Sequence, residues 1–263
     1  MYNLQERFYK NLEVLFANHP SLITPSFEKK IKRSVGVLHH GYLLGACKEA
    51  VALVDKNQGK IQNNLFDAIM DIYSKRRNQY QAKFFLLQCF ENALRSTMAT
   101  TFASAFNRSK DDWFLRFSND YRYVIGKIDS IICLRNKKLK EPIYKENCTT
   151  FDIFDLFSLG DLEEILEKYY YPHFEWIFKE EKIYKGQILP VFGTKQHAID
   201  TITRIRSARN EIFHNKPTRI KFQKDVEILL LRLGYNLSKA SKSINLQGFL
   251  HLKFGEEVPS KDI

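Results

Sequence analysis

The amino-acid sequence predicts an all-α protein, on three observations. Apolar residues recur at spacings of three and four over most of the chain, which is the period of an amphipathic helix. Glycine and proline are scarce, with 11 and 7 copies among 263 residues, which favours long helices over a turn-rich sheet protein. No stretch shows the strict alternation of apolar and polar residues that is typical of a half-buried strand.

The first part of the chain, residues 1–78, is expected to form an N-terminal helical section. Its apolar periodicity predicts three helices, at residues 8–16, 29–52 and 61–77. Pro20 interrupts the pattern after the first helix. The polar run 74–78 is expected to separate this section from the next domain.

A larger helical domain, residues 79–243, is expected to follow, and its helices are predicted near 79–106, 120–133, 158–170, 194–215 and 224–243. Thr149 and Ser158 are residue types that commonly cap a helix N-terminus. Pro172 is expected to end the helix over 158–170. The C-terminal tail, residues 244–263, is expected to be loosely held.

The formal net charge is +11 and the sequence pI is about 9.3, which indicates a polyanionic partner. Nucleic acid is the first candidate because phosphate contacts release counterions. An anionic membrane surface is the second, and good solubility is the simplest explanation of the same surplus. The most apolar stretch, Val35–Val54, contains Lys48 and Glu49 and so does not predict a membrane span. Because residues 1–6 show no signal-peptide pattern, we expect a cytoplasmic protein with no membrane partner.

The four cysteines are Cys47, Cys89, Cys133 and Cys148. None pair at C-x-x-C spacing, and no histidine lies nearby at ligand spacing. We therefore expect no metal site and no cofactor, and free buried thiols in a reducing compartment.

The segment 194–215 holds the most informative pattern. On a helical wheel, one broad apolar stripe is formed by Ala198, Ile199, Ile202, Ile205, Ile212 and Phe213. Arg209 falls near the middle of this stripe, where a charge is costly unless it is paired or used. Asn210 and His214 are four residues apart and lie at the edge of the stripe. The pattern therefore brings a cation, an amide and an imidazole to the end of one helix.

These three residue types suit RNA cleavage by the substrate's own 2′-hydroxyl. Histidine changes charge near neutral pH, so His214 can transfer a proton in the transition state. Arg209 can hold the scissile phosphate and stabilise its developing charge, and Asn210 can orient the phosphate or the histidine. A purely structural interpretation stays open, in which Arg206 and Arg209 pair with acids such as Glu163 or Glu211.

The motif Arg209-Asn210-x-x-x-His214 resembles the R-x4–6-H motif of HEPN ribonucleases. Two further blocks are similar to those of Abi-like (abortive-infection) proteins of this type. The first is Glu91-Asn92-Ala93-Leu94-Arg95 in a long helix, followed by Trp113-Phe114. The second is Leu156-Phe157-Ser158-Leu159-Gly160, with Trp176 following it. The resemblance covers about residues 80–235, and it departs at Asn215, where the family often has a second histidine.

The resemblance implies a HEPN-type helical bundle that forms a homodimer, with a composite active site containing Arg209 and His214 of both chains. It implies a metal-independent endoribonuclease that acts in phage defence or as the toxin of a toxin–antitoxin system. An RNA or protein antitoxin is the further partner that it implies.

Other residues are candidates for lesser roles. Glu91, Arg95 and Arg206 are expected to support the active site. Weaker candidates for RNA binding are Lys32, Arg33, Lys137, Lys138, Lys140, Lys216 and Arg219. Arg33 and His39 also have R-x5-H spacing, although Gly36 weakens a helix there. His173 is either a second catalytic group or part of a packed aromatic turn, and residues 169–171 either stack on bases or belong to the core.

Two alternatives to the enzyme remain open at this point. One is a non-catalytic RNA-binding or regulatory HEPN module. The other is a helical scaffold or antitoxin-binding protein in which Arg209 is a structural ion-pair residue.

Overall fold

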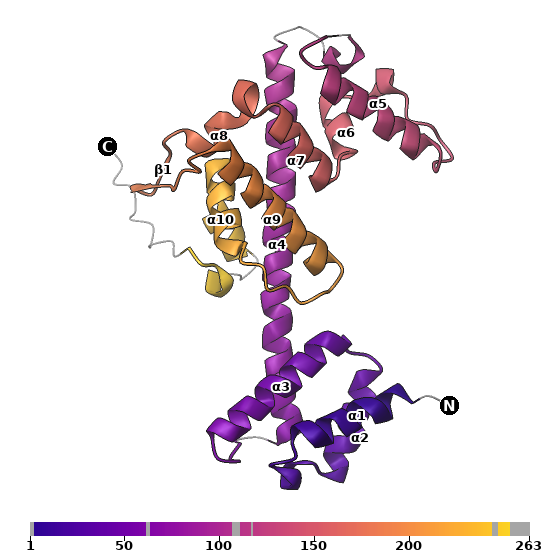
Figure 1. Ribbon diagram of the computed structural model, residues 1–263, viewed down its shortest axis with the longest axis vertical. Helices are drawn as coiled ribbons and strands as arrows, with labels where there is room; N and C mark the ends of the chain where they lie inside the picture. Colours follow the sequence, from indigo (N-terminus) through magenta and orange to yellow (C-terminus); the bar gives the residue numbers. More distant parts are fainter. Residues whose placement is uncertain (1–2, 62–63, 107–110, 117, 244–246, 253–263) are drawn as a thin grey trace. The chain divides into compact units, whose positions relative to one another are not determined.

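The computed structural model describes residues 3–61, 64–106, 111–116, 118–243 and 247–252, and these residues confirm the all-α prediction (Figure 1). The only sheet in this described part has two strands of two residues each. The chain divides into two compact units. The first contains residues 1–83 and 211–218, and the second contains residues 84–210 and 219–263.

The first unit is built on four helical segments: α1 (Leu4–Leu15), α2 (Pro25–Val35), α3 (His40–Lys56) and the part of α4 (Leu65–Ala105) up to Lys83. A short 3₁₀ turn, η1 (Pro20–Leu22), joins the first two helices. Their apolar faces form one core, which includes Phe8, Leu12, Phe16, Phe27, Ile31, Leu43, Cys47 and Ile69. The amphipathic pattern of the sequence therefore accounts for the packing of this unit.

The prediction of one helix over residues 29–52 is wrong, because the chain turns between α2 and α3 at residues 36–39. Gly36 is the C-cap of α2. His39 caps the N-terminus of α3, since its ring nitrogen Nδ1 accepts a 3.4 Å hydrogen bond from the Tyr42 amide. Arg33 and His39 thus belong to α2 and to the cap of α3, so their spacing does not place them on one helix.

The prediction of two helices on either side of residues 74–78 is also wrong, because α4 runs without a break from Leu65 to Ala105. The run Ser-Lys-Arg-Arg-Asn is polar but contains neither glycine nor proline, and Lys and Arg are good helix formers. The division between the units falls after Lys83, inside this helix, instead of at residues 74–78. The segment 211–218 joins the first unit although it is remote in sequence.

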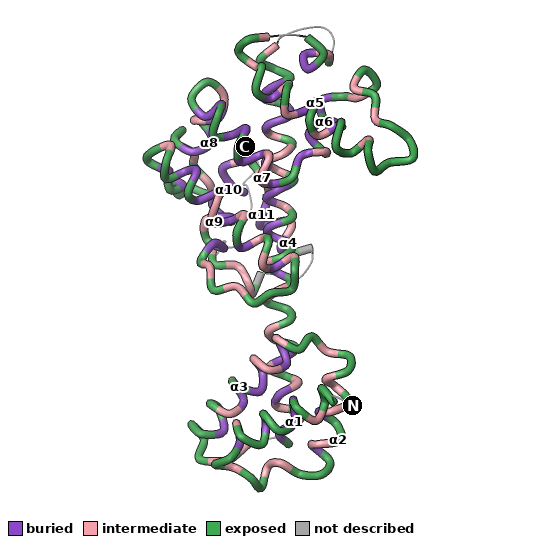
Figure 2. The backbone as a smooth tube through the Cα atoms, turned by 45° about the vertical axis from the view of Figure 1, so that its right-hand side comes forward, coloured by how far each residue is buried: buried purple, intermediate pink, exposed green. Residues whose placement is uncertain are grey.

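The second unit contains the rest of α4 and a series of shorter helices. These are η2 (Trp113–Leu115), α5 (Arg122–Asn136), η3 (Lys145–Asn147), α6 (Thr150–Asp155), α7 (Leu159–Lys168), α8 (Glu175–Lys179), α9 (Lys195–Phe213), α10 (Gln223–Arg232), α11 (Leu237–Ser243) and η5 (Gln247–Phe249). The last three residues of α9 belong to the first unit. Within the second unit, α7, α9 and α10 lie alongside α4, and buried residues follow all four helices (Figures 1 and 2).

The connections of the second unit follow local sequence signals. Thr149 and Ser158 both form capping boxes, with Asp152 and Asp161 respectively, as their residue types predict. After α7 ends, Pro172 lies in a single π-helical turn, η4 (Tyr170–Phe174). The strands β1 (Ile183–Tyr184) and β2 (Gln187–Ile188) pair as a hairpin, and both turn residues have positive φ.

The predicted single helix over residues 224–243 is wrong as well. Gly234 has a φ of 81° and separates α10 from α11. Its amide and that of Tyr235 donate to the carbonyls of Leu231 and Leu230, at 3.0 and 2.9 Å. This left-handed termination is the one that glycine favours. In the described part of the chain, no helix combines the length and the apolar character that crossing a bilayer requires.

Candidate functional site on α9

The helix α9 presents the apolar stripe that its sequence predicts. Thr194 caps it by accepting a 3.1 Å hydrogen bond from the His197 amide. The stripe residues Ala198, Ile199, Ile202, Ile205 and Ile212 are all buried. Arg209 lies on this stripe, and 28% of its side chain remains exposed. The Arg209 side chain therefore lies at the border of the core.

Arg209 is held by an ion pair with a buried carboxylate of α4. Its Nε donates to Oε2 of Glu91 at 3.2 Å, and Oε1 of the same carboxylate accepts from Nη2 of Arg95 at 2.8 Å. Glu91 is 8% exposed. One carboxylate thus lies between two guanidinium groups, so the arrangement joins Arg209 to two of the residues expected to support it.

Arg95 also connects α4 to α6 and to the segment before α7. Its Nε and Nη2 each donate at 3.1 Å to a backbone carbonyl, those of Phe154 and Phe157. Its Nη1 donates to Oδ1 of Asn92. Arg95 therefore orients Glu91 and fixes the segment that leads into α7, instead of facing solvent.

Removing the carboxylate should leave two partly buried cations without their shared counter-charge. We expect Glu91→Ala to lower the free energy of unfolding by about 3 kcal/mol, the range measured when one member of a buried pair is deleted. Urea denaturation measures this loss. The exposed acid Glu167 on α7 is a matched control, since Glu167→Ala should change stability by less than about 0.5 kcal/mol. Equal effects of the two substitutions would contradict a structural role for Glu91.

Arg206 lies one turn before Arg209 and has a different partner. Its Nε donates to Oε2 of Glu163 on α7 at 2.5 Å, and Thr203 Oγ1 donates to Oε1 of the same carboxylate at 2.5 Å. Glu163 is 8% exposed. Arg206 thus connects α9 to α7, and its partner Glu163 is one of the acids that the structural interpretation named. The structure does not join Arg206 to Glu91.

Asn210 and His214 are both exposed. Asn210 Oδ1 accepts from Nη1 of Arg209 at 3.4 Å, so these two motif residues touch. His214 follows the last residue of α9 and belongs to the first unit, whereas Arg209 and Asn210 belong to the second. The sequence could not predict that the division between units would fall inside the motif.

Asn215, the position at which the sequence departs from the family pattern, ends α9 by its backbone geometry. Its φ is 54°, in the left-handed region. The amides of Asn215 and Lys216 donate to the carbonyls of Ile212 and Glu211, at 2.9 and 2.8 Å. This is a Schellman termination, in which asparagine is tolerated better than most residues. The local structure thus gives Asn215 a role that does not depend on catalysis.

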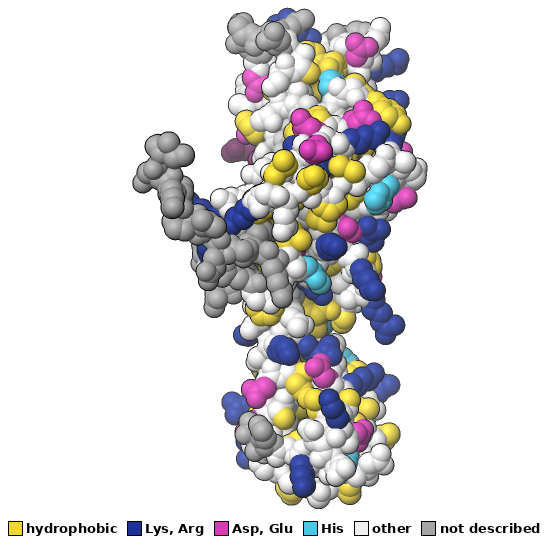
Figure 3. All heavy atoms as spheres, turned by 90° about the vertical axis from the view of Figure 1, so that its left-hand side faces the viewer, with side chains coloured by type: hydrophobic (Ala, Val, Ile, Leu, Met, Phe, Trp, Pro, Cys, Tyr) yellow, Lys and Arg dark blue, Asp and Glu magenta, His cyan; other side chains and the backbone are white. Residues whose placement is uncertain are grey.

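The weaker candidates for RNA binding differ in their surroundings. Lys32 forms ion pairs with Glu6 and Glu28, at 2.5 Å each, and these hydrogen bonds raise its pKa. Its charge is therefore already compensated. The others are exposed: Arg33, Lys137, Lys138, Lys140, Lys216 and Arg219. On the face drawn in Figure 3, basic and acidic side chains are interspersed over both units.

His173 lies within a packed aromatic cluster of the second unit. Its Nε2 is 3.1 Å from the Tyr121 hydroxyl, and its ring centroid is 5.5 Å from that of Phe102. Tyr169 and Tyr170 are buried and His173 is half-buried, whereas Tyr171 is 65% exposed. These contacts agree with the packed-turn interpretation of His173, and burial lowers its pKa.

The lowered pKa gives an expected pH dependence of stability. The unfolded chain binds a proton at His173 more readily than the folded chain does, so stability should fall as the pH drops through the unfolded value of 6.5. We expect His173→Phe to weaken this acid sensitivity. The measurement is the urea midpoint of both proteins between pH 7.5 and pH 5. An unchanged pH dependence in the variant would show that other groups cause it.

Two buried charged residues of α10 were not singled out from the sequence. Glu227 is wholly buried and accepts from the amides of His251 and Leu252, at 2.9 and 2.7 Å. Arg232 is 1% exposed and donates to the carbonyls of Ile177, Glu180 and Pro190, at 2.6, 2.6 and 3.2 Å. Burial lowers the pKa of Arg232. Their positions in the sequence could have indicated burial, because Glu227 lies inside the apolar run Val226–Leu231 and Arg232 directly follows it.

The cysteines are all free thiols. The expectation that they are buried is confirmed for Cys47 and is wrong for Cys133, which is exposed. Burial raises the pKa of Cys47 to about 12. Among the described residues, no group of three or more His, Cys, Asp and Glu side chains is arranged to hold a metal ion.

No protein-family model, curated protein or solved structure matches the chain.

Proposed function

We propose that this protein is a metal-independent endoribonuclease of HEPN type, in which Arg209, Asn210 and His214 are the catalytic residues. The observation that carries the proposal is the position of Arg209. A charged residue is kept on the buried stripe of α9, oriented by Glu91 and Arg95, with 28% of its side chain exposed. An oriented guanidinium on a partly exposed side chain, next to an exposed amide, suits recognition of a phosphodiester.

The proposed reaction needs only the substrate's own nucleophile. The 2′-hydroxyl oxygen attacks the adjacent phosphorus and loses its proton, while the bond from phosphorus to the 5′-oxygen breaks and that oxygen gains a proton. The products are a 2′,3′-cyclic phosphate and a 5′-hydroxyl end. In the proposal, Arg209 stabilises the charge on the phosphoryl oxygens, and His214 transfers one of the two protons. A homodimer with a composite site would supply the second histidine.

The test is cleavage of total RNA in EDTA by purified wild-type protein and by His214→Ala. Cleavage by wild type alone, with cyclic-phosphate ends, is the expected result. Cleavage by neither protein, with both folded, dimeric and free of bound inhibitor, would refute the enzyme.

The cellular role that we propose is growth arrest in phage defence or as the toxin of a toxin–antitoxin pair, with an RNA or protein antitoxin. Expression of the wild-type chain without its antitoxin should therefore stop growth, and His214→Ala should relieve the arrest. Equal growth inhibition by both chains would contradict this role.

A second candidate is a helical scaffold, and the Glu91–Arg209 ion pair favours it, because a paired arginine can serve structure alone. Arg209→Lys separates the two functions. Lysine keeps the charge but lacks the planar donor array of arginine. The enzyme predicts a loss of cleavage with retained stability, whereas the scaffold predicts no RNA phenotype.

A further inference from the structure

A groove runs along one face of α5 in the second unit, and we call it the α5 groove. It consists of two successive cavities of about 690 and 380 Å³. The helix lines them with Tyr123, Gly126, Lys127, Ser130, Ile131, Leu134 and Arg135. These positions follow one another at spacings of three and four, with the adjacent pairs at 126–127, 130–131 and 134–135, so they form a single helical face. The two cavities are therefore consecutive parts of one surface.

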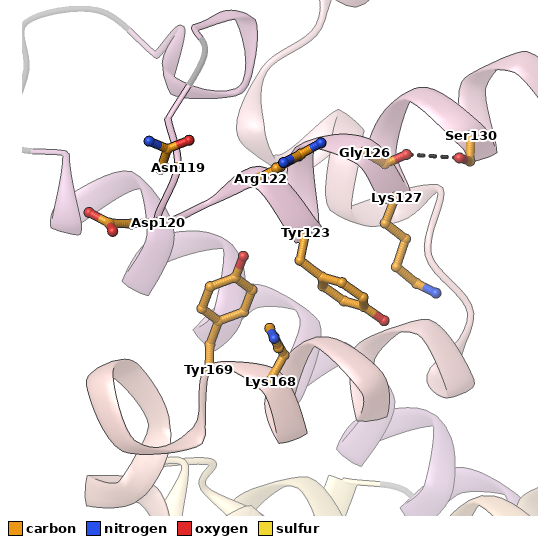
Figure 4. Close-up of a pocket in the computed structure, with 9 residues that line it drawn as sticks. All are labelled: Asn119, Asp120, Arg122, Tyr123, Gly126, Lys127, Ser130, Lys168 and Tyr169. Atoms are coloured by element: carbon orange, nitrogen blue, oxygen red, sulfur yellow. Dashed lines mark hydrogen bonds between the residues drawn. The ribbon is translucent and has the colours of Figure 1, made fainter.

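The opposite wall of the α5 groove comes from α7 and its caps. Lys168 and Tyr169 line the first cavity, and Ser158 and Asp161 line the second. Figure 4 shows that Tyr123 and Lys127 point from α5 toward the space that Lys168 and Tyr169 reach from the other side. The ammonium of Lys127 pairs with Asp161 at 2.9 Å and with Glu164 at 2.6 Å. These ion pairs join the two walls and fix their spacing.

The α5 groove has a surplus of positive charge. The residues that line it include five Lys and Arg residues and two Asp residues, a surplus of three positive charges. Arg122, Lys138 and Lys168 are exposed lining residues, and none of them forms an ion pair with another described residue. The acidic lining residues are Asp120 and Asp161, and Lys127 compensates the second. Three exposed cations thus remain available to an anionic ligand.

The same groove offers an aromatic surface. Tyr123 is 39% exposed, and its hydroxyl donates to Oε2 of Glu164 at 3.1 Å, which fixes the orientation of the ring. Leu134, farther along the groove, is 60% exposed. A fixed aromatic ring beside cations is the combination on which unpaired bases stack while phosphates are held.

We propose that the α5 groove binds single-stranded RNA, with backbone phosphates at Arg122, Lys168 and Lys138 and a base stacked on Tyr123. This inference rests on the proposed function, because it assigns the surface that holds the RNA substrate. A duplex does not suit it, since its bases are already stacked on one another and cannot reach the ring. The first cavity, at about 690 Å³, lies within the volume range of small-ligand sites and can accept an unstacked nucleotide.

The groove is distinct from the motif on α9, because α7 makes contacts in both directions. Glu163 faces α9 through Arg206 and Thr203, whereas the next residue, Glu164, faces α5 through Tyr123 and Lys127. The α5 groove is therefore on a different face of α7 from α9, the helix that carries Arg209. Binding at the groove can be altered without touching the proposed catalytic residues.

The test measures binding without cleavage. A short fluorescent 2′-O-methyl oligouridine lacks the attacking hydroxyl, so its anisotropy reports binding alone. We expect Arg122→Gln combined with Lys168→Gln to weaken binding about tenfold, and to reduce the slope of log affinity against log salt by about 1.4, as two lost phosphate contacts predict. The control combines Lys48→Gln with Lys56→Gln on α3, two exposed lysines with the same total charge change. It should weaken binding by less than about twofold.

Tyr123 supplies an independent comparison. Tyr123→Ala should weaken binding about tenfold, the effect of losing one stacked base. Tyr123→Phe keeps the ring and loses only the hydrogen bond that orients it, so it should weaken binding much less than Tyr123→Ala does. Circular dichroism establishes that each variant is folded.

The outcomes separate the two proposals. Equal weakening by the test and control pairs, or no binding by wild type, would overturn the assignment of the α5 groove. If the groove variants weaken binding but the wild-type protein does not cleave ordinary RNA, the enzyme is refuted and the RNA-binding module is supported. Cleavage that is insensitive to all groove variants would refute the groove and retain the enzyme.

Discussion

Replacing His214 with alanine is expected to reduce the rate of RNA cleavage about a thousandfold, the middle of the range that a positioned general acid or base contributes. The side chain is exposed, and it follows the end of α9. Its removal should therefore change the free energy of unfolding by less than about 0.5 kcal/mol. The measurement is the initial rate on a fluorogenic RNA, with urea denaturation of the same samples.

His197 is the matched control for this prediction. It is exposed and lies near the other end of α9. His197→Ala should cleave RNA at the wild-type rate. Imidazole added to the His214→Ala protein should restore part of the lost activity, because it can supply the missing proton-transfer group. A rate near wild type in His214→Ala without imidazole would remove His214 from the mechanism.

The second large effect is expected on stability, at Arg232. Its guanidinium donates to three backbone carbonyls around α8 and the hairpin that follows. Methionine fills much of the volume but cannot donate to these carbonyls, and a hydrogen bond to a charged group contributes about 1.5–3 kcal/mol. We expect Arg232→Met to lower the free energy of unfolding by about 4 kcal/mol, measured by urea denaturation.

Arg116→Met removes an arginine in an exposed setting. Arg116 pairs with Asp112 across one helical turn, and half of its side chain is exposed, at 50%. This substitution should cost less than about 1 kcal/mol. If the two substitutions destabilised equally, the carbonyl contacts of Arg232 would carry no special weight.

Local signals in the sequence were sufficient for much of the fold. The caps at Thr149 and Ser158 and the apolar stripe of α9 follow from short patterns that need no distant partner. The ends of helices were harder to predict than the helices themselves. The polar run 74–78 suggested a boundary, but its residues favour helix. Gly36 and Gly234 end helices where apolar periodicity alone continues through them.

The candidate site was predictable only in part for the same reason. The i, i+4 spacing indicated that Glu91 and Arg95 would pair, and they do. That Arg209 would meet the same carboxylate depends on how α4 and α9 pack, which no local pattern specifies. The carbonyl partners of Arg232 and the facing walls of the α5 groove likewise come from segments far apart in sequence.

The contacts of Glu91 and Arg95 also imply an order of assembly. The pair itself spans 4 residues, Arg95 reaches Phe154 and Phe157 over 59 and 62 residues, and Glu91 reaches Arg209 over 118. Closing longer loops costs more chain entropy, so the most distant contact is the least favoured early in folding. A chain growing from its N-terminus contains the carboxylate and its first partner long before Arg209 is added. The arginine of the motif is therefore fixed late, after the helices that hold it have been synthesised.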